Sequence, residues 1–197
     1  MYRLLLDSSD INLLVGISKD DKVVYRHFEY AWQRQSEYMI PEIEKALLNV
    51  GITLKDIDEV VVGIGPGSYT GVRIPLTIAK TLNAVNNINV VAISSLKMLG
   101  HNDEKYISLM NARSARSYIG IYNNGETVFE DGIIENAKLD EFIKGYLEEG
   151  YSLKGNLAYL KKDIKVDDTM IENMLSHALK TKSVVNVDGL CPVYLKD

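Results

Sequence analysis

Cysteine, histidine and proline are scarce in this 197-residue sequence, which contains one, three and four of them. With Cys191 as the only cysteine, the chain cannot form an internal disulfide, and no Cys/His cluster can build a zinc site. His27, His101 and His177 stand singly, so the paired histidines of a metal-binding helix are missing as well. We therefore expect no metal site in this chain.

Basic runs and long apolar runs are also missing. The formal net charge is -5, and Lys and Arg form no row of the kind that binds phosphate backbones, which argues against stand-alone nucleic-acid binding. No segment is apolar over enough residues for a signal-peptide core or a membrane span. We expect a cytoplasmic protein without membrane association, and the ordinary content of hydrophobic residues, 46%, predicts that the chain folds.

Apolar periodicity predicts an α/β protein in which one pattern occurs twice. In the first half the expected strands are 2–7, 11–18, 23–30, 57–64 and 89–93, and the expected helices are 33–49 and 70–85. In the second half the expected strands are 105–110, 117–122, 127–134 and 151–154, with a helix around 139–146, a short strand at 164–166, a helix at 170–179 and an extended tail at 191–195. Three strands followed by alternating helix and strand, used twice, indicate two tandem ribonuclease-H-like lobes of the actin-like (ASKHA) type, here 1–100 and 101–197.

A glycine-rich segment joins the predicted strand 57–64 to the helix after it. Its members are Gly65, Pro66, Gly67, Ser68, Thr70, Gly71 and Arg73. Backbone N–H groups at such a helix start can hold an anion, but the spacing fails the dinucleotide fingerprint and no P-loop lysine is present. The alternative is a packing role, in which the glycines let the loop approach a neighbouring backbone while Ser68 or Thr70 caps the helix.

Two further polar groups could carry chemistry. Asp7, Ser8 and Ser9 end the first strand, where they could face the metal and phosphates of a nucleotide or could simply form a polar turn. A nucleotide cleft would want a second acidic loop in the other lobe, but that position holds Asn111. Ser68 as a nucleophile has no obviously placed histidine base and no nucleophile-elbow register.

The segment from Gly65 to Ile74 closely resembles the hallmark of the bacterial TsaB (YeaZ) family. Supporting similarities run along the chain: Asp7-Ser8-Ser9, Ser94-Ser95-Leu96, Asn111-Ala112-Arg113 and Pro192-Val193-Tyr194-Leu195. The sequence departs from the family pattern at Gln35-Ser36, where many relatives have His-Ser, and at Asn111, which replaces Asp. Both departures weaken any case for metal or nucleotide chemistry within this chain.

The resemblance implies a non-catalytic, cofactor-free subunit in the formation of N6-threonylcarbamoyladenosine at position 37 of tRNA. Its implied partners are a catalytic TsaD-like subunit and a TsaE-like ATPase, with tRNA reached only through the complex and a homodimer formed when the chain is unpartnered. Partner binding is expected through the two first-lobe helices. The second helix carries two apolar rows, and we expect contacts from one of them and from the first helix: Met39, Ile43, Leu47, Ile74, Ile78 and Leu82.

Two rival functions remain open at this point. One is an ATP-dependent small-molecule kinase of the same superfold, which would use Asp7 and the glycine-rich segment on phosphates. The other is a peptidase, for which the sequence offers neither a metal pair nor a convincing triad.

Overall fold

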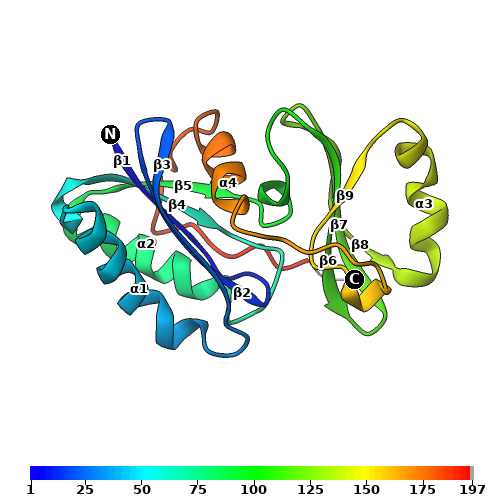
Figure 1. Ribbon diagram of the computed structural model, residues 1–197, viewed down its shortest axis with the longest axis horizontal. Helices are drawn as coiled ribbons and strands as arrows, with labels where there is room; N and C mark the ends of the chain where they lie inside the picture. Colours follow the sequence, from blue (N-terminus) through cyan, green and yellow to red (C-terminus); the bar gives the residue numbers. More distant parts are fainter. Residues whose placement is uncertain (196–197) are drawn as a thin grey trace.

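The computed structural model describes residues 1–195, and it contains two β-sheets with helices packed on their faces (Figure 1). The first sheet has the order β3-β2-β1-β4-β5. Strand β2 runs antiparallel to its neighbours β1 and β3, whereas β4 and β5 run parallel to β1. Its strands are β1 (Tyr2–Asp7), β2 (Asn12–Lys19), β3 (Lys22–Tyr30), β4 (Ile57–Gly63) and β5 (Asn89–Ile93). The strands predicted for the first half, and their order along the chain, are thereby confirmed.

Two helices cover one face of this sheet, α1 (Gln35–Val50) and α2 (Arg73–Asn86). The buried face of α1 carries Met39, Ile43 and Ala46, which are three or four residues apart as a helix requires. Gly51, with φ +74°, ends α1 in the left-handed conformation that glycine adopts without strain.

The second sheet repeats the strand pattern in a shorter form, with the order β8-β7-β6-β9. Its strands are β6 (Lys105–Arg113), β7 (Arg116–Asn123), β8 (Glu126–Glu135) and β9 (Ser152–Lys154), and α3 (Asn136–Glu148) packs on its outer face. Single turns of 3₁₀ helix occur at Leu54–Asp56, Lys97–Leu99 and Ala158–Leu160. The repeat of three antiparallel strands plus a parallel strand confirms the two ribonuclease-H-like units.

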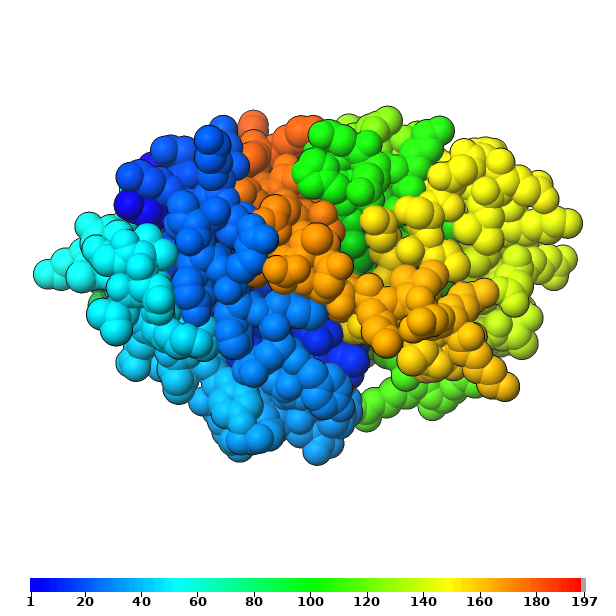
Figure 2. Space-filling view, viewed as in Figure 1, coloured from blue at the N-terminus to red at the C-terminus, as the bar shows by residue number. Residues whose placement is uncertain are grey.

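The last helix, α4 (Met170–Ala178), packs on the face of the first sheet opposite α1 and α2. A Cβ on Gly16 of β2 would lie 2.7 Å from Cγ2 of Ile171, so the glycine leaves room for this helix. Figure 2 shows the segment around α4, in orange, lying between the blue N-terminal part and the green and yellow second half. The short strand expected at 164–166 is wrong, because these residues form no ladder with either sheet in the described structure.

A buried cluster joins the two sheets. Tyr106, Met110 and Tyr122 of the second sheet pack with Leu5 and Val61 of the first. Residues 94–102, which join the two halves, contain no Gly/Ser/Pro-rich linker, as expected for halves that share a core.

Polar bonds cross the same junction. Ser94 after β5 and Tyr122 on β7 both donate hydrogen bonds to the carboxylate of Asp131 on β8. Nε2 of His177 on α4 lies 3.1 Å from Oη of Tyr106 and 3.0 Å from the Gly100 carbonyl oxygen.

The chain returns to the first sheet after α4. The N–H of Val184 donates to the Val90 carbonyl at 2.7 Å, and the N–H of Val193 donates to the Ile64 carbonyl at 2.7 Å. The division of the chain at residue 100 stays a prediction, and positions 196–197 of the expected second lobe lie outside the described residues. Within residues 1–195, no helix has both the length and the apolar character needed to cross a bilayer.

Candidate functional site

The glycine-rich loop between β4 and α2 packs directly against the turn that follows β1. A Cβ added to Gly67 or Gly71 would lie within 3 Å of the carbonyl oxygens of Ser9 and Ser8, respectively. The Ser68 N–H donates to the Ser9 carbonyl at 2.7 Å, and the Ser8 hydroxyl donates to the Gly71 carbonyl, also at 2.7 Å. Close backbone approach therefore requires these glycines, as the packing interpretation of the motif predicts.

Gly65 meets the C-terminal segment in a similar way. Its φ is +100°, and an added Cβ would lie 2.7 Å from the Val193 carbonyl oxygen. Its N–H donates to the Ser95 hydroxyl at 2.9 Å. Two distant segments thus fix the start of the loop.

Most backbone N–H groups of the loop donate hydrogen bonds to acceptors within the chain. The Gly71 N–H donates to the Ser68 hydroxyl at 3.2 Å, and the Arg73 N–H donates to the Thr70 carbonyl at 3.1 Å. A phosphate cradle requires several free N–H groups that converge on one point. The helix begins at Arg73 rather than Thr70, and its N-cap residue, Val72, makes no side-chain capping bond. The expected cap by Ser68 or Thr70 is therefore wrong, because the Ser68 hydroxyl accepts the Gly71 N–H in the preceding turn instead.

Asp7, Ser8 and Ser9 bond to the chain itself. The N–H and hydroxyl of Ser9 both donate to Oδ2 of Asp7, at 3.1 and 3.0 Å. Oδ1 of Asp7 is buried without a hydrogen-bond partner among residues 1–195. Burial raises the pKa of Asp7 to about 7, although the bonds from Ser9 act in the opposite direction. The three residues hold a tight turn under the glycine-rich loop.

Arg73, the cation of the glycine-rich segment, contacts two tyrosines. Its guanidinium carbon lies 3.8 Å from the ring centroid of Tyr69, and its Nε donates to Oη of Tyr194 at 2.7 Å. The two tyrosine rings stack with centroids 5.4 Å apart. Sequence reasoning missed this cluster because Arg73 and Tyr194 are separated by 121 positions, and no local pattern reports such a pairing.

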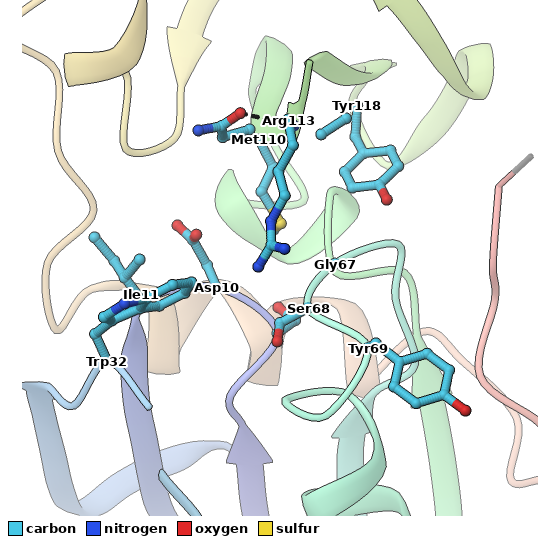
Figure 3. Close-up of a pocket in the computed structure, with 12 residues that line it drawn as sticks. Asp10, Ile11, Trp32, Gly67, Ser68, Tyr69, Met110, Arg113 and Tyr118 are labelled. Atoms are coloured by element: carbon cyan, nitrogen blue, oxygen red, sulfur yellow. Dashed lines mark hydrogen bonds between the residues drawn. The ribbon is translucent and has the colours of Figure 1, made fainter. Parts of the chain in front are cut away.

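A pocket of about 290 Å³ opens between the two sheets (Figure 3). Arg113, at the tip of the β6–β7 hairpin, points across it toward Ser68 and Asp10 of the first half. Asp10 accepts a hydrogen bond from Nδ2 of Asn156 at 2.7 Å, and burial raises its pKa. The pocket is lined by Ser9, Asp10, Ile11, Trp32, Gly67, Ser68, Tyr69, Met110, Asn111, Ala112, Arg113 and Tyr118.

A hydrolase centre at Ser68 finds no support in these contacts. His27 pairs with Glu29 and Glu42, and His177 is buried at the junction of the sheets. His101 lies beside Asp103. No histidine contacts Ser68, and no group of three or more metal-binding side chains occurs, in the part of the chain that the structure describes.

The six expected partner contacts divide into two groups. Met39, Ile43, Leu47 and Leu82 are buried in the core beneath α1 and α2, so they offer no free surface to a partner. Ile74 and Ile78 are half-buried, so part of each side chain packs against the core and part stays accessible. The other row of α2 is buried at Val72, Leu76 and Ala79, but its last member, Val85, is exposed.

The six expected contacts do not include the apolar side chains that these helices expose most. Ile40 and Leu48 on α1 are 49% and 80% exposed, and Val85 on α2 is 75% exposed. Ile40 and Leu48 each directly follow a buried position, so they fall outside the regular apolar row. A search for apolar residues off that row would have found them.

Comparison with known proteins finds similarity to proteins of tRNA threonylcarbamoyladenosine biosynthesis. A family profile described as "TsaD: tRNA N6-adenosine threonylcarbamoyltransferase" matches residues 29–189. A Bacillus subtilis protein named "tRNA threonylcarbamoyladenosine biosynthesis protein TsaB" is 28% identical over 100% of this chain and 94% of its own length. The protein of the same name from Buchnera aphidicola is 31% identical over 72% of both chains. The structure of YeaZ from Pseudomonas aeruginosa superposes with a TM-score of 0.74 at 21% identity, covering 98% of this chain and 99% of that chain.

Proposed function

The chain belongs to the bacterial TsaB (YeaZ) family, and on that premise we propose that it is a non-catalytic subunit that binds and orients a TsaD-type transferase during formation of N6-threonylcarbamoyladenosine in tRNA. The reaction itself then takes place on the partner. This chain supplies a rigid surface.

The outward face of the α1/α2 pair is the observation that carries this proposal. Ile40 and Leu48 of α1 and Val85 of α2 are exposed, and Ile74 and Ile78 of α2 are half-buried against the core. Exposed apolar side chains on two adjacent helices are costly in water and typical of a surface that another protein covers. We call these five residues the outer helix face.

The chemistry of the remaining surface supports a non-catalytic assignment. The glycine-rich loop forms hydrogen bonds with Ser9 and Ser95. Asp7 is buried, and its Oδ2 accepts hydrogen bonds from Ser9. Asn111 stands where a kinase of this superfold would use an acidic residue. These contacts also weigh against the kinase alternative, because several of the groups it would use, the Ser68 and Gly71 N–H groups and Oδ2 of Asp7, already bond within the chain.

The proposal also covers how the chain relates to an ATPase, to a second copy of itself and to tRNA. A TsaE-like ATPase acts on the complex rather than on this chain alone. Without its partner the chain forms a two-fold homodimer through the outer helix face, since that face is self-complementary in its apolar character. With a net charge of -5, the chain approaches tRNA only as part of the complex.

Reconstitution tests the proposal directly. The chain is combined with the TsaC-, TsaD- and TsaE-like proteins of the same organism, and threonylcarbamoyladenosine in tRNA is measured by mass spectrometry. We expect product only when both this chain and the TsaD-like protein are present. Full product without this chain would contradict the proposal and would bring forward a test of Mg-ATP binding by the isolated chain.

A further inference from the structure

The β6–β7 hairpin holds Arg113 in an unusual backbone. Arg113, Ser114 and Ala115 have φ values of 64°, 49° and 56°, so three consecutive residues other than glycine are left-handed. Such residues are uncommon because the Cβ is crowded in this region. The Arg113 N–H donates to Oδ1 of Asn111 at 2.9 Å, which closes the hairpin tip and fixes the direction in which the arginine leaves it.

The guanidinium of Arg113 is available to a ligand. No carboxylate among residues 1–195 lies within 4 Å of it, whereas the exposed Arg26 pairs with both Asp168 and Glu172. Asp10, the carboxylate in the pocket lining, is bonded to Asn156 instead. An arginine that a strained turn aims into a pocket without an ion-pair partner is suited to receive an anionic group.

Arg113 also borders the outer helix face. A second hollow, of about 250 Å³, lies between the N-terminal ends of α1 and α2 and is lined by Ser36 and Ile74. Trp32, Ser68 and Arg113 line both this hollow and the pocket between the sheets. The two hollows therefore adjoin at Arg113, and a protein that covers Ile74 passes close to it.

We infer that the partner-binding surface extends from the outer helix face to the second lobe, where Arg113 binds a carboxylate side chain of the partner subunit. Trp32 packs beside that side chain at the entrance of the pocket. This inference rests on the proposed function, because it concerns the same partner. It adds a polar contact from a part of the chain far from the two helices in sequence.

Charge and composition favour a protein carboxylate over a free phosphate. A phosphate site usually offers several free N–H donors. In the loop beside Arg113, the N–H groups of Ser68 and Gly71 already donate hydrogen bonds within the chain. A guanidinium alone matches a carboxylate through two parallel hydrogen bonds. Arg and Trp beside an apolar patch are also the residue types enriched at the centres of protein interfaces.

The test measures the affinity of the full-length chain for the TsaD-like partner by isothermal titration calorimetry. Arg113→Gln is expected to weaken binding on the order of 10-fold to 100-fold, because it leaves the partner's carboxylate without its cation. Arg113→Glu should weaken binding further, and replacing the matching Asp or Glu of the partner by Lys should restore it. The control, Arg26→Gln, removes an exposed arginine that is ion-paired within the chain and should bind like the wild type.

The outcomes separate this inference from the proposed function. If Leu48→Asp abolishes binding while Arg113→Gln binds like the wild type, the Arg113 contact is wrong and the helix surface stands. If neither variant changes the affinity, the proposed interface fails as a whole. The titrations are repeated with and without inorganic phosphate; an effect of Arg113→Gln that occurs only with phosphate would overturn the carboxylate assignment in favour of a bound ion.

Discussion

Nε of Arg73 donates a hydrogen bond to Oη of Tyr194 at 2.7 Å and so ties the first residue of α2 to the C-terminal segment. Tyr69 stacks on Tyr194 and lies under the same guanidinium. Two turns further along α2, Nζ of Lys80 donates a hydrogen bond to the Asp188 carbonyl oxygen at 2.9 Å. The C-terminal segment therefore supports one flank of α2, and its opposite flank carries Ile74 and Ile78.

Tyr194→Phe should lower the free energy of unfolding slightly, because it removes one solvent-exposed hydrogen bond from a charged donor but keeps the stacked ring. Tyr194→Ala should cost more, since the stacking on Tyr69 is lost as well. Urea unfolding measures both. Tyr30→Phe, at a tyrosine that is 69% exposed, serves as the control and should leave stability unchanged.

Gly71→Ala should destabilise the chain by about 2 kcal/mol or more, because the new methyl group would meet the backbone carbonyl of Ser8, which cannot rotate away. The matched control is Gly145→Ala in α3, where no atom lies within 4 Å of an added Cβ. That change should stabilise the chain by roughly 0.5–1 kcal/mol through helix propensity. Equal effects of the two variants in thermal unfolding would contradict the packing role of the loop.

Most of the fold could be predicted from local pattern. The strands of both sheets and the helices α1, α3 and α4 lie within a few residues of their expected places, because apolar alternation and helical spacing directly reflect one-sided burial. The position of α4 could not be predicted. Its apolar spacing fits a helix on either sheet, and only the tertiary structure places Ile171 against Gly16 of the first sheet.

The candidate site was harder to predict for the same reason. Helical periodicity shows that Met39, Ile43 and Leu47 share a face of α1, but it does not tell whether that face meets the chain's own sheet or a partner. The structure buries all three. Arg113 belongs to a predicted motif, but its position beside Ser68 depends on how the two sheets pack, which no local pattern encodes.

Asp7 and His177 should make opposite contributions to stability across the same pH range. Burial raises the pKa of Asp7 from 3.8 to about 7, so the folded state binds more protons there, and this contribution lowers stability as the pH rises from about 4 to 7. Burial lowers the pKa of His177 from 6.5 to about 4, so the unfolded chain binds more protons, and this contribution lowers stability as the pH falls from 6.5 to 4.

Single substitutions should separate the two contributions. Asp7→Asn removes the first and should leave a chain that loses stability more steeply toward pH 4 than the wild type. His177→Gln removes the second and should leave a chain that loses stability more steeply toward pH 7. Urea unfolding across this pH range measures both slopes, and parallel profiles for the two variants would contradict the assignment.

Leu48→Asp should abolish binding of the TsaD-like partner while leaving the chain folded. Leu48 is 80% exposed, so the carboxylate is fully hydrated in the free chain but would be buried without a cation in the complex, which costs several kcal/mol. Ile78→Asp should also abolish binding, but it should reduce stability as well, because Ile78 packs partly on the core. Val128→Asp, at a valine of the second sheet that is 45% exposed, is the control and should bind like the wild type. Calorimetric titration gives the affinities and circular dichroism the fold; a folded Leu48→Asp variant that binds normally would place the partner away from α1.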